Sequence, residues 1–289
     1  NKLISLKDYL SLYIVDHGFV RAIYPNLYAI DNQMYRSSQP SPKQLKILKS
    51  KYGFKTIINL RGENGLLHSM GPGQVWVDLT TNQPELAREL AQEIIDTGAI
   101  AIDAPVTGAV DGARNGNMTQ FAGGDKETIE RIRPVMELMG PVHYMGSNGS
   151  GSITKLASNQ LWAIHATAMG EALVMAVKSG VELSRAWEAL KIGASESWCM
   201  HHDAPSVFAG HYDPSFTLDL CQKDLNLIVQ ACDDAGTEAP TTRLVCDRFE
   251  MAKKRYGGDK GELHVVKLEE DAADVSLQMD GNWTPHWEK

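Results

Sequence analysis

Residues 146–160 read GSNGSGSITKLASNQ, and the character of the chain changes within them. From residue 75 up to this stretch, strand-like segments alternate with segments of helical periodicity. Beyond Gly151 no strand-like segment follows, and apolar residues recur at helical spacing. The alternation predicts an α/β sheet region, largely parallel with room for antiparallel members, and the second part of the chain is predicted to be all-helical.

The expected elements follow from this pattern and from the turn residues between them. Asn82 is expected to cap the helix that starts at Pro84. The strands are expected over 54–60, 75–79, 99–106, 117–124 and 141–146. The helices are expected over 3–24, 42–51, 84–97, 125–139, 153–180, 183–191, 219–235, 241–256 and 264–272.

Composition excludes several classes of function. The chain has 289 residues and a net charge of −8, and no basic stripe that would bind nucleic acid. It has no run of about 18 apolar residues, so no membrane-spanning segment is expected. Its four cysteines show neither disulfide-scaffold density nor the CxxC spacing of zinc sites, which favours a reduced, cytoplasmic protein.

Lys155 and Asn159 form the first candidate site. They are four residues apart, so they share one helical face near the predicted start of the helix, where free N–H groups and the dipole attract anions. A lysine there could exchange a proton with a substrate hydroxyl, with the asparagine fixing its orientation. The alternative is an ordinary helix with an exposed lysine. The glycines do not form a GxGxxG dinucleotide site, because Thr154 occupies the third glycine position.

Three other segments carry polar residues that could bind a ligand. DAPVTGAVDGARNG (103–116) places Thr107, Gly108 and Ala109 after a strand, where backbone amides could hold a carboxylate or could simply form a connection. Lys223 and Asp224 lie on a predicted helix, where a solvated charge pair is the alternative reading. No metal site is expected in residues 199–203, because adjacent histidines on a regular element point apart.

Together with DLTTNQP (78–84) and KDL (223–225), these motifs make residues 66–273 resemble the β-hydroxyacid dehydrogenase family, of the 3-hydroxyisobutyrate dehydrogenase type. The resemblance implies a Rossmann domain followed by a helical domain, NAD or NADP as cofactor, a small hydroxy acid as substrate, and a homo-oligomer. It implies that the catalytic residues are Lys155 as acid and base and Asn159, and that Thr107, Gly108 and Ala109 bind the substrate carboxylate. The cofactor-binding residues implied are Thr81, Lys223 and Asp224. Ala109 stands where the family usually has glycine.

The first 65 residues depart from that family. They contain no GxGxxG turn, and the segment 34–64 resembles the N-terminal part of bacterial tyrosine or dual-specificity phosphatase-like proteins. Such phosphatases need an arginine six positions after a catalytic cysteine, and none of the four cysteines has one there. The chain therefore looks like a chimera of a phosphatase-like segment (1–65), a partial Rossmann-like cofactor domain (66–150) and an all-helical substrate and dimerisation domain (151–289).

The expected fold is thus an incomplete Rossmann-like sheet region followed by an all-α domain. Three functions stay open at this stage. The first is an NAD(P)-dependent 3-hydroxy acid dehydrogenase. The second is a non-catalytic fusion whose helical domain only folds and oligomerises through its long small-residue helix. The third is a phosphatase-like module that lacks its cysteine and arginine.

Overall fold

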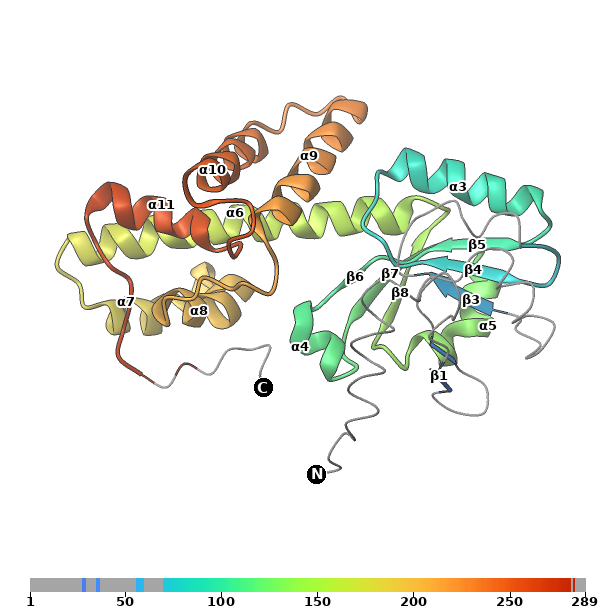
Figure 1. Cartoon of the computed structure of the whole chain (residues 1–289), viewed down its shortest axis with the longest axis horizontal. Coiled ribbons are helices and arrows are strands. Elements are labelled where there is room, and N and C mark those ends of the chain that lie inside the picture. The colour runs from blue at the N-terminus through green and yellow to red at the C-terminus, as the bar shows by residue number, and fades with distance from the viewer. Residues whose placement is uncertain (1–27, 30–34, 37–55, 60–69, 282, 284–289) are drawn as a thin grey trace, which may run out of the picture.

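The computed structural model describes residues 28–29, 35–36, 56–59, 70–281 and 283. A sheet-containing part and a helical part lie side by side, and the 29-residue helix α6 (Ser150–Lys178) runs through both (Figure 1). The predicted order, an α/β region followed by an all-helical region, is confirmed. The helices predicted over 3–24 and 42–51 lie outside the described residues.

The elements of the two parts are as follows. The main sheet contains β3 (Thr56–Asn59), β4 (Val75–Asp78), β5 (Ile100–Asp103), β6 (Val106–Thr107), β7 (Thr119–Gly124) and β8 (Val142–Gly146). Its helices are α3 (Pro84–Asp96), α4 (Ala109–Arg114) and α5 (Lys126–Met136). A separate antiparallel pair is formed by β1 (Tyr28–Ala29) and β2 (Tyr35–Arg36). The helical part adds α7 (Leu183–Leu190), the 3₁₀ turn η2 (Gly193–Ser195), the π-helical turn η3 (Cys199–Asp203), α8 (Ala204–Phe208), α9 (Leu218–Asp234), α10 (Pro240–Tyr256) and α11 (His264–Ala273).

The sheet is mixed, with strand order β3-β4-β5-β7-β6 and with β8 paired to β7. β3, β4 and β5 are parallel neighbours, whereas β7 runs antiparallel to β5 and to β6. The unit β4–α3–β5 is the crossover that parallel neighbours require. Its register sets Asp78 beside Asp103, so two carboxylates end adjacent parallel strands. That edge of an α/β sheet is where ligands bind.

Helices cover both faces of the sheet, as Figure 1 shows for α3 and α5. One face packs against α3, and its apolar residues alternate along the strands with those of the other face. The α3 side comprises Trp76, Leu90, Ala91, Ile94, Ala99 and Ala101. The opposite side, toward α5, includes Val75, Val77, Ile102, Ala122, Ile129, Ile132 and Met136. The sheet is therefore the middle layer of three.

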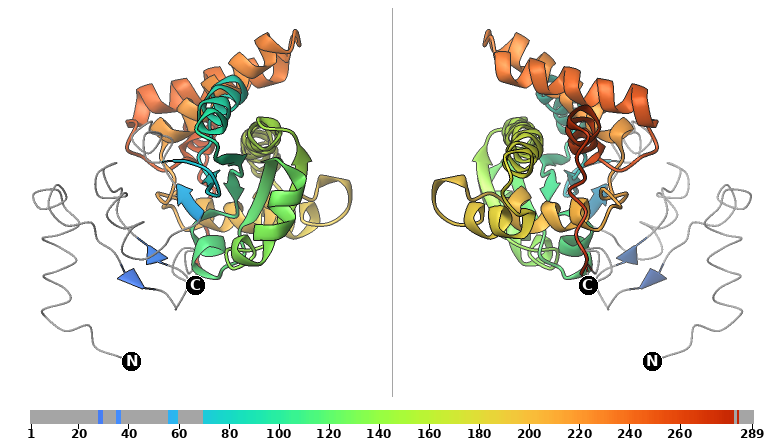
Figure 2. Two further views of the ribbon diagram at one scale, coloured as in Figure 1. Left: turned by 90° about the vertical axis from the view of Figure 1, so that its right-hand side faces the viewer. Right: turned by 90° about the vertical axis from the view of Figure 1, so that its left-hand side faces the viewer.

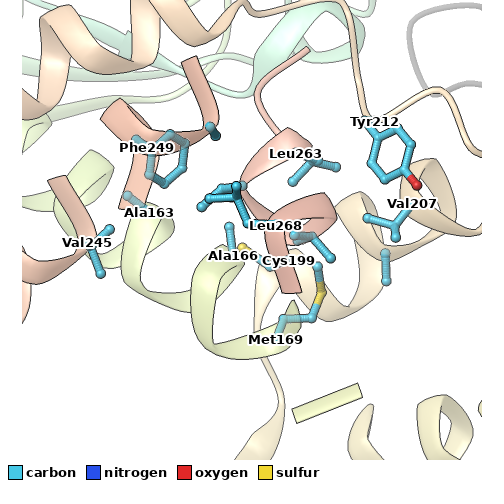
Figure 3. Packing of buried hydrophobic residues seen from close by; sticks show 14 of the residues in the cluster. Ala163, Ala166, Met169, Cys199, Val207, Tyr212, Val245, Phe249, Leu263 and Leu268 are labelled. Atoms are coloured by element: carbon cyan, nitrogen blue, oxygen red, sulfur yellow. The ribbon is translucent and has the colours of Figure 1, made fainter. Parts of the chain in front are cut away.

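The helical part has a single large core built around α6. α6 is seen almost end-on in Figure 2, with α9 and α10 to one side of it and α7 and α8 to the other. The small side chains of Ala163 and Ala166 belong to this core, and Figure 3 shows Ala163 near Phe249 of α10 and Ala166 near Leu268 of α11. A Cβ added at Gly170 would come within 3.0 Å of Val266, so glycine permits this close approach. The small-residue face of α6 is thus used within the chain, and the expected oligomer stays a prediction.

Two local predictions differ from the structure. The N-cap of α3 is Gln83 and not Asn82, whose side-chain amide instead donates to Asp78 Oδ2 at 3.2 Å. The strand expected over 99–106 is interrupted after Asp103 and continues as β6. Pro105 explains the interruption, because it has no N–H to donate to a neighbouring strand.

Candidate active site

Lys155 lies in the second turn of α6, and its side chain is buried. Only 9% of the residue is exposed. Burial lowers the pKa of its ammonium group to about 8, against the opposing charges of Asp224 and Glu262. The alternative reading of an exposed lysine on an ordinary helix is therefore wrong. A buried lysine whose pKa lies near neutrality can both accept and donate a proton at physiological pH.

Asn159 lies one turn further along the same face of α6. Its Nδ2 donates a hydrogen bond to Oδ2 of Asp224 at 2.8 Å. Asp224 is buried on α9, and its Oδ1 lies 2.9 Å from Nζ of Lys223. Asp224 thus contacts an amide and an ammonium group and raises the pKa of Lys155 through its charge. The reading of Lys223 and Asp224 as a solvated pair holds only for Lys223, which is half exposed.

Thr81 reaches this group of residues from the sheet. Nζ of Lys223 donates to the carbonyl oxygen of Thr81 at 3.2 Å, just beyond the carboxyl end of β4. A second bond nearby runs from Nε2 of Gln83 to the carbonyl oxygen of Leu227 at 3.3 Å. The end of β4 is therefore tied to α9. Residues that are 142 positions apart in the chain meet where β4 ends.

Asp103 caps the start of α6, a role that the sequence pattern did not predict. Its Oδ1 accepts from the backbone N–H of Gly149 at 2.8 Å, and its Oδ2 accepts from the N–H of Ser152 at 2.8 Å and from its hydroxyl at 3.2 Å. Burial raises the pKa of Asp103 despite these bonds. The helix start thus attracts an anion, as expected, but that anion is a carboxylate of the chain itself, and the N–H groups of Gly149 and Ser152 are not free for a ligand.

The glycines of the stretch 146–151 serve close packing in this structure. A Cβ added at Gly151 would lie 2.1 Å from the carbonyl oxygen of Phe121 and 2.7 Å from that of Asp103. Gly149 has a φ of +88°, which an L side chain rarely adopts. Gly151 allows the first turn of α6 to lie directly on the backbone of β5 and β7, and Gly149 provides the left-handed turn ahead of it, close to Arg88 of α3. That contact positions Lys155 relative to the sheet.

Thr107, Gly108 and Ala109 form the passage from β6 into α4. Thr107 pairs with Thr119 of β7, and Gly108 and Ala109 have φ angles of +133° and +55°. Glycine tolerates such a conformation, whereas alanine is strained in it. No hydrogen bond or ion pair given for the described residues joins these three to Lys155. The structure thus groups Lys155, Asn159, Lys223, Asp224 and Thr81, and leaves residues 107–109 as a separate element.

Asp78 shapes the loop that carries Thr81. Its Oδ1 accepts from the N–H of Thr80 at 3.0 Å and its Oδ2 accepts from Asn82, while burial raises its pKa. The hydroxyl of Thr80 is buried and has no hydrogen-bond partner within the described part of the chain. Such a group would be satisfied by a ligand at the end of β4. A signal for Asp78 and Asp103 is present in the sequence, since each is the one aspartate within a predicted apolar strand, and the observed strands β4 and β5 end at these residues.

His202 in the turn η3 has carboxylates on both sides of its ring. Its Nδ1 lies 2.7 Å from Oδ1 of Asp203, and its Nε2 lies 3.3 Å from Oδ2 of Asp111 on α4. Over the described residues, no group of three or more His, Cys, Asp or Glu side chains has a geometry that could hold a metal ion. His202 therefore links η3 of the helical part to α4 of the sheet-containing part.

Two family models match the chain, one on either side of the start of α6. The model described as the NAD binding domain of 6-phosphogluconate dehydrogenase matches residues 48–146. The model described as NAD-binding of NADP-dependent 3-hydroxyisobutyrate dehydrogenase matches residues 149–268, which include Lys155, Asn159, Lys223 and Asp224. The first match begins upstream of the boundary expected at residue 65. The resemblance of residues 1–64 to phosphatase-like proteins stays a prediction.

Curated relatives and solved structures agree with these models. The chain is 34% identical over 218 residues to a probable 3-hydroxyisobutyrate dehydrogenase-like protein of Arabidopsis thaliana, with 75% of this chain and 65% of the relative covered. It is 30% identical to the 2-hydroxy-3-oxopropionate reductase of Escherichia coli, with 75% of each chain covered. Its fold is similar to that of the Mycobacterium tuberculosis 3-hydroxyisobutyrate dehydrogenase, with a TM-score of 0.66, 24% identity, and 80% and 77% of the two chains covered.

None of the helices in the described part of the chain combines the length and the apolar composition that crossing a membrane requires. The cytoplasmic location expected from the cysteines stays a prediction.

Proposed function

Because the chain belongs to the 3-hydroxyisobutyrate dehydrogenase-like β-hydroxyacid dehydrogenase family, we propose that it is an NAD(P)-dependent oxidoreductase of a small 3-hydroxy acid. The observation that carries the proposal is the buried Lys155 with a pKa of about 8, one helical turn from an asparagine fixed by Asp224. General acid–base catalysis needs a group whose pKa lies near the working pH. The chain covers 65% of the length of the Arabidopsis relative. The activity named for that relative is therefore a proposal for this chain.

In the oxidative direction, the neutral amine of Lys155 accepts the proton of the substrate hydroxyl as the O–H bond breaks and the C=O bond forms. When bound, NAD(P)⁺ supplies the acceptor for the hydride that leaves the same carbon. Asn159 holds the hydroxyl in line with Nζ of Lys155, and its own orientation is fixed by the 2.8 Å bond to Asp224. Reduction reverses the proton transfer, with the ammonium form of Lys155 as the donor.

The remaining proposed roles concern binding. Thr107, Gly108 and Ala109 hold the substrate carboxylate with a hydroxyl and backbone amides. Thr81 and Lys223 bind the nicotinamide end of the cofactor, with Asp224 supporting the lysine. The proposal also includes the assembly of the protein into a homo-oligomer.

The chain fits one end of a dinucleotide better than the other. At the end of β4, the buried Thr80 hydroxyl, which has no hydrogen-bond partner among the described residues, and the ammonium group of Lys223 suit a polar nicotinamide amide. The diphosphate end normally lies on a glycine turn at a helix start. The sequence holds no complete GxGxxG, and the start of α6 is occupied by Asp103. The nicotinamide end is therefore the part of the cofactor that the chain's residues suit.

The missing glycine turn favours one alternative, a non-catalytic fusion. In that reading residues 1–65 are a phosphatase-like segment without its cysteine and arginine, residues 66–150 hold no cofactor, and residues 151–289 only fold and oligomerise. Titration with NADH and NADPH, followed by fluorescence or calorimetry, separates the two readings. Saturable binding of either supports the oxidoreductase, and the absence of binding supports the fusion.

Turnover then tests the lysine. NAD(P)⁺-dependent oxidation of 3-hydroxyisobutyrate and related 3-hydroxy acids is measured for the wild type and for Lys155→Ala. We expect the substitution to lower kcat by about 10²- to 10⁴-fold and to leave cofactor binding nearly unchanged. Lys178→Ala, at the exposed end of the same helix, is the matched control and should keep wild-type turnover. Equal turnover of the Lys155 variant and the control would exclude Lys155 as the acid and base.

A further inference from the structure

We infer that His202 is a positioning residue for the substrate-binding loop: held between Asp203 and Asp111, it fastens α4, and with it Thr107–Ala109, to the helical part of the molecule. The inference rests on the proposed function, because it takes residues 107–109 as the carboxylate site. It adds a residue from η3, directly ahead of α8, to the groups that define the site.

The helical side of this connection is rigid. η3 is a π-helical turn, which is rare and occurs frequently at functional sites. Asp203 is only 2% exposed, and its second oxygen accepts from Nε1 of Trp162 on α6 at 2.8 Å. Its first oxygen lies 2.7 Å from Nδ1 of His202. Asp203 is therefore fixed to the central helix, and it fixes the orientation of the imidazole ring.

The ring faces α4 with its other nitrogen. Nε2 of His202 lies 3.3 Å from Oδ2 of Asp111, and one face of the ring stacks on Trp198 at a centroid distance of 4.3 Å. The side chain of His202 is 12% exposed and that of Asp111 is 23% exposed. Solvent therefore screens this pair less than a surface pair, so its contribution exceeds that of an exposed salt bridge.

Asp111 connects His202 to residues 107–109, because Asp111 and these residues lie together at the start of α4. It lies in the first turn of α4, and the N–H of Gly112 closes that turn on the carbonyl oxygen of Gly108. On its other side the loop is held by the two-residue strand β6, which pairs with β7. A six-residue helix has little stability of its own. The bond from His202 is therefore a specific constraint on the backbone amides of residues 107–109.

Several charged groups surround the ring, and the net effect favours the imidazolium. Burial alone would lower the pKa of His202, but the hydrogen bonds and charges of Asp203 and Asp111 outweigh it and raise the pKa. The other ionisable groups on the two elements are Arg114 on α4, and Cys199 and His201 on η3. His201 pairs away from the ring, with Glu196 at 3.3 Å. A doubly protonated ring donates from both nitrogens, so both bonds are present together below this pKa.

The experiment compares the wild type, His202→Gln and Asp111→Asn with His201→Gln as matched control. Hydrogen exchange of residues 106–116 is measured without ligand, and KM and kcat are measured with the best 3-hydroxy acid. For the two test variants we expect several-fold faster exchange and an increase in KM of about tenfold, the equivalent of one charge-assisted hydrogen bond, with kcat changed less than about twofold. The wild-type KM should rise above the pKa of His202, and this rise should be absent in His202→Gln.

Two results would overturn the inference. The first is that His202→Gln has the same KM and the same hydrogen exchange of residues 106–116 as the control His201→Gln. The second is that these residues exchange faster in His202→Gln while its KM stays unchanged. Failure of the proposed function looks different, since it appears as absence of turnover in the wild type. In that case the exchange data still decide whether His202 holds α4 in place.

Discussion

Replacing Lys155 with methionine tests directly whether burial, and not a neighbouring charge, sets its pKa. Methionine keeps the length and removes the charge. The shift from 10.5 to about 8 is 2.5 units, which at 1.36 kcal/mol per unit corresponds to about 3 kcal/mol of unfavourable burial of the ammonium form. Lys155→Met should therefore raise the free energy of unfolding at pH 7, by up to about 3 kcal/mol.

The sign of the pH dependence follows from linkage. Because the folded pKa is lower than the unfolded one, the unfolded chain binds more protons between pH 8 and pH 10.5, and wild-type stability rises with pH across that window. The advantage of the methionine variant should shrink from about 3 kcal/mol at pH 7 to about 2 kcal/mol at pH 9.

Urea unfolding at pH 7 and pH 9 measures both values, with Lys178→Met as the matched surface control. The control should lie within about 0.5 kcal/mol of the wild type at both pH values. A methionine variant that is less stable than the wild type at pH 7, or whose advantage does not change with pH, would refute the burial argument.

Three further predictions concern the residues around this lysine. The pH profile of kcat for oxidation should rise to a plateau with an inflection near pH 8, and Asp224→Asn should move that inflection to lower pH, because the Asp224 charge raises the pKa of Lys155; an unmoved inflection would mean that another group titrates. Asp103→Asn should lower the free energy of unfolding by about 1–3 kcal/mol, since one amide oxygen cannot serve both backbone donors; Asp125→Asn, at a single-bond helix cap where asparagine suffices, should cost little in the same urea titration. Ala109→Gly should raise the melting temperature, because it relieves about 1 kcal/mol of strain at φ +55°; a lower melting temperature would show that the loop gains more from alanine than it loses.

The division of the fold was predictable because its periodicities are strong. Strands 75–78 and 100–103 are short apolar runs bounded by turn residues, and α6, α9 and α10 have long helical patterns, so each lies within a few residues of its expected place. The predicted ends of the individual helices and strands were less accurate than their order. Asparagine is a common N-cap residue, so Asn82 was expected to cap α3. Its side chain instead donates to the buried carboxylate of Asp78, four residues earlier.

The candidate site was only partly predictable. The i,i+4 spacing places Lys155 and Asn159 on one face, but no pattern in the sequence shows that the face is buried. The pairing of Asn159 with Asp224, and of Lys223 with Thr81, depends on how α9 packs against the sheet edge. Asp103 was missed because its partners, Gly149 and Ser152, are more than forty positions away. Long-range contacts of this kind follow from topology and not from local propensity.

The helix α6 has a practical consequence for how the molecule can be divided. At 1.5 Å per residue its 29 residues span about 43 Å, and they belong to both parts, so no flexible linker separates the two. A cut at the expected boundary between residues 150 and 151 would fall inside its first turn and separate the carboxylate of Asp103 from the two donors of Ser152. The two halves should therefore express poorly as fragments. Engineered hybrids with related proteins should exchange segments ahead of β8, so that Asp103's donors and Lys155 stay on one continuous helix.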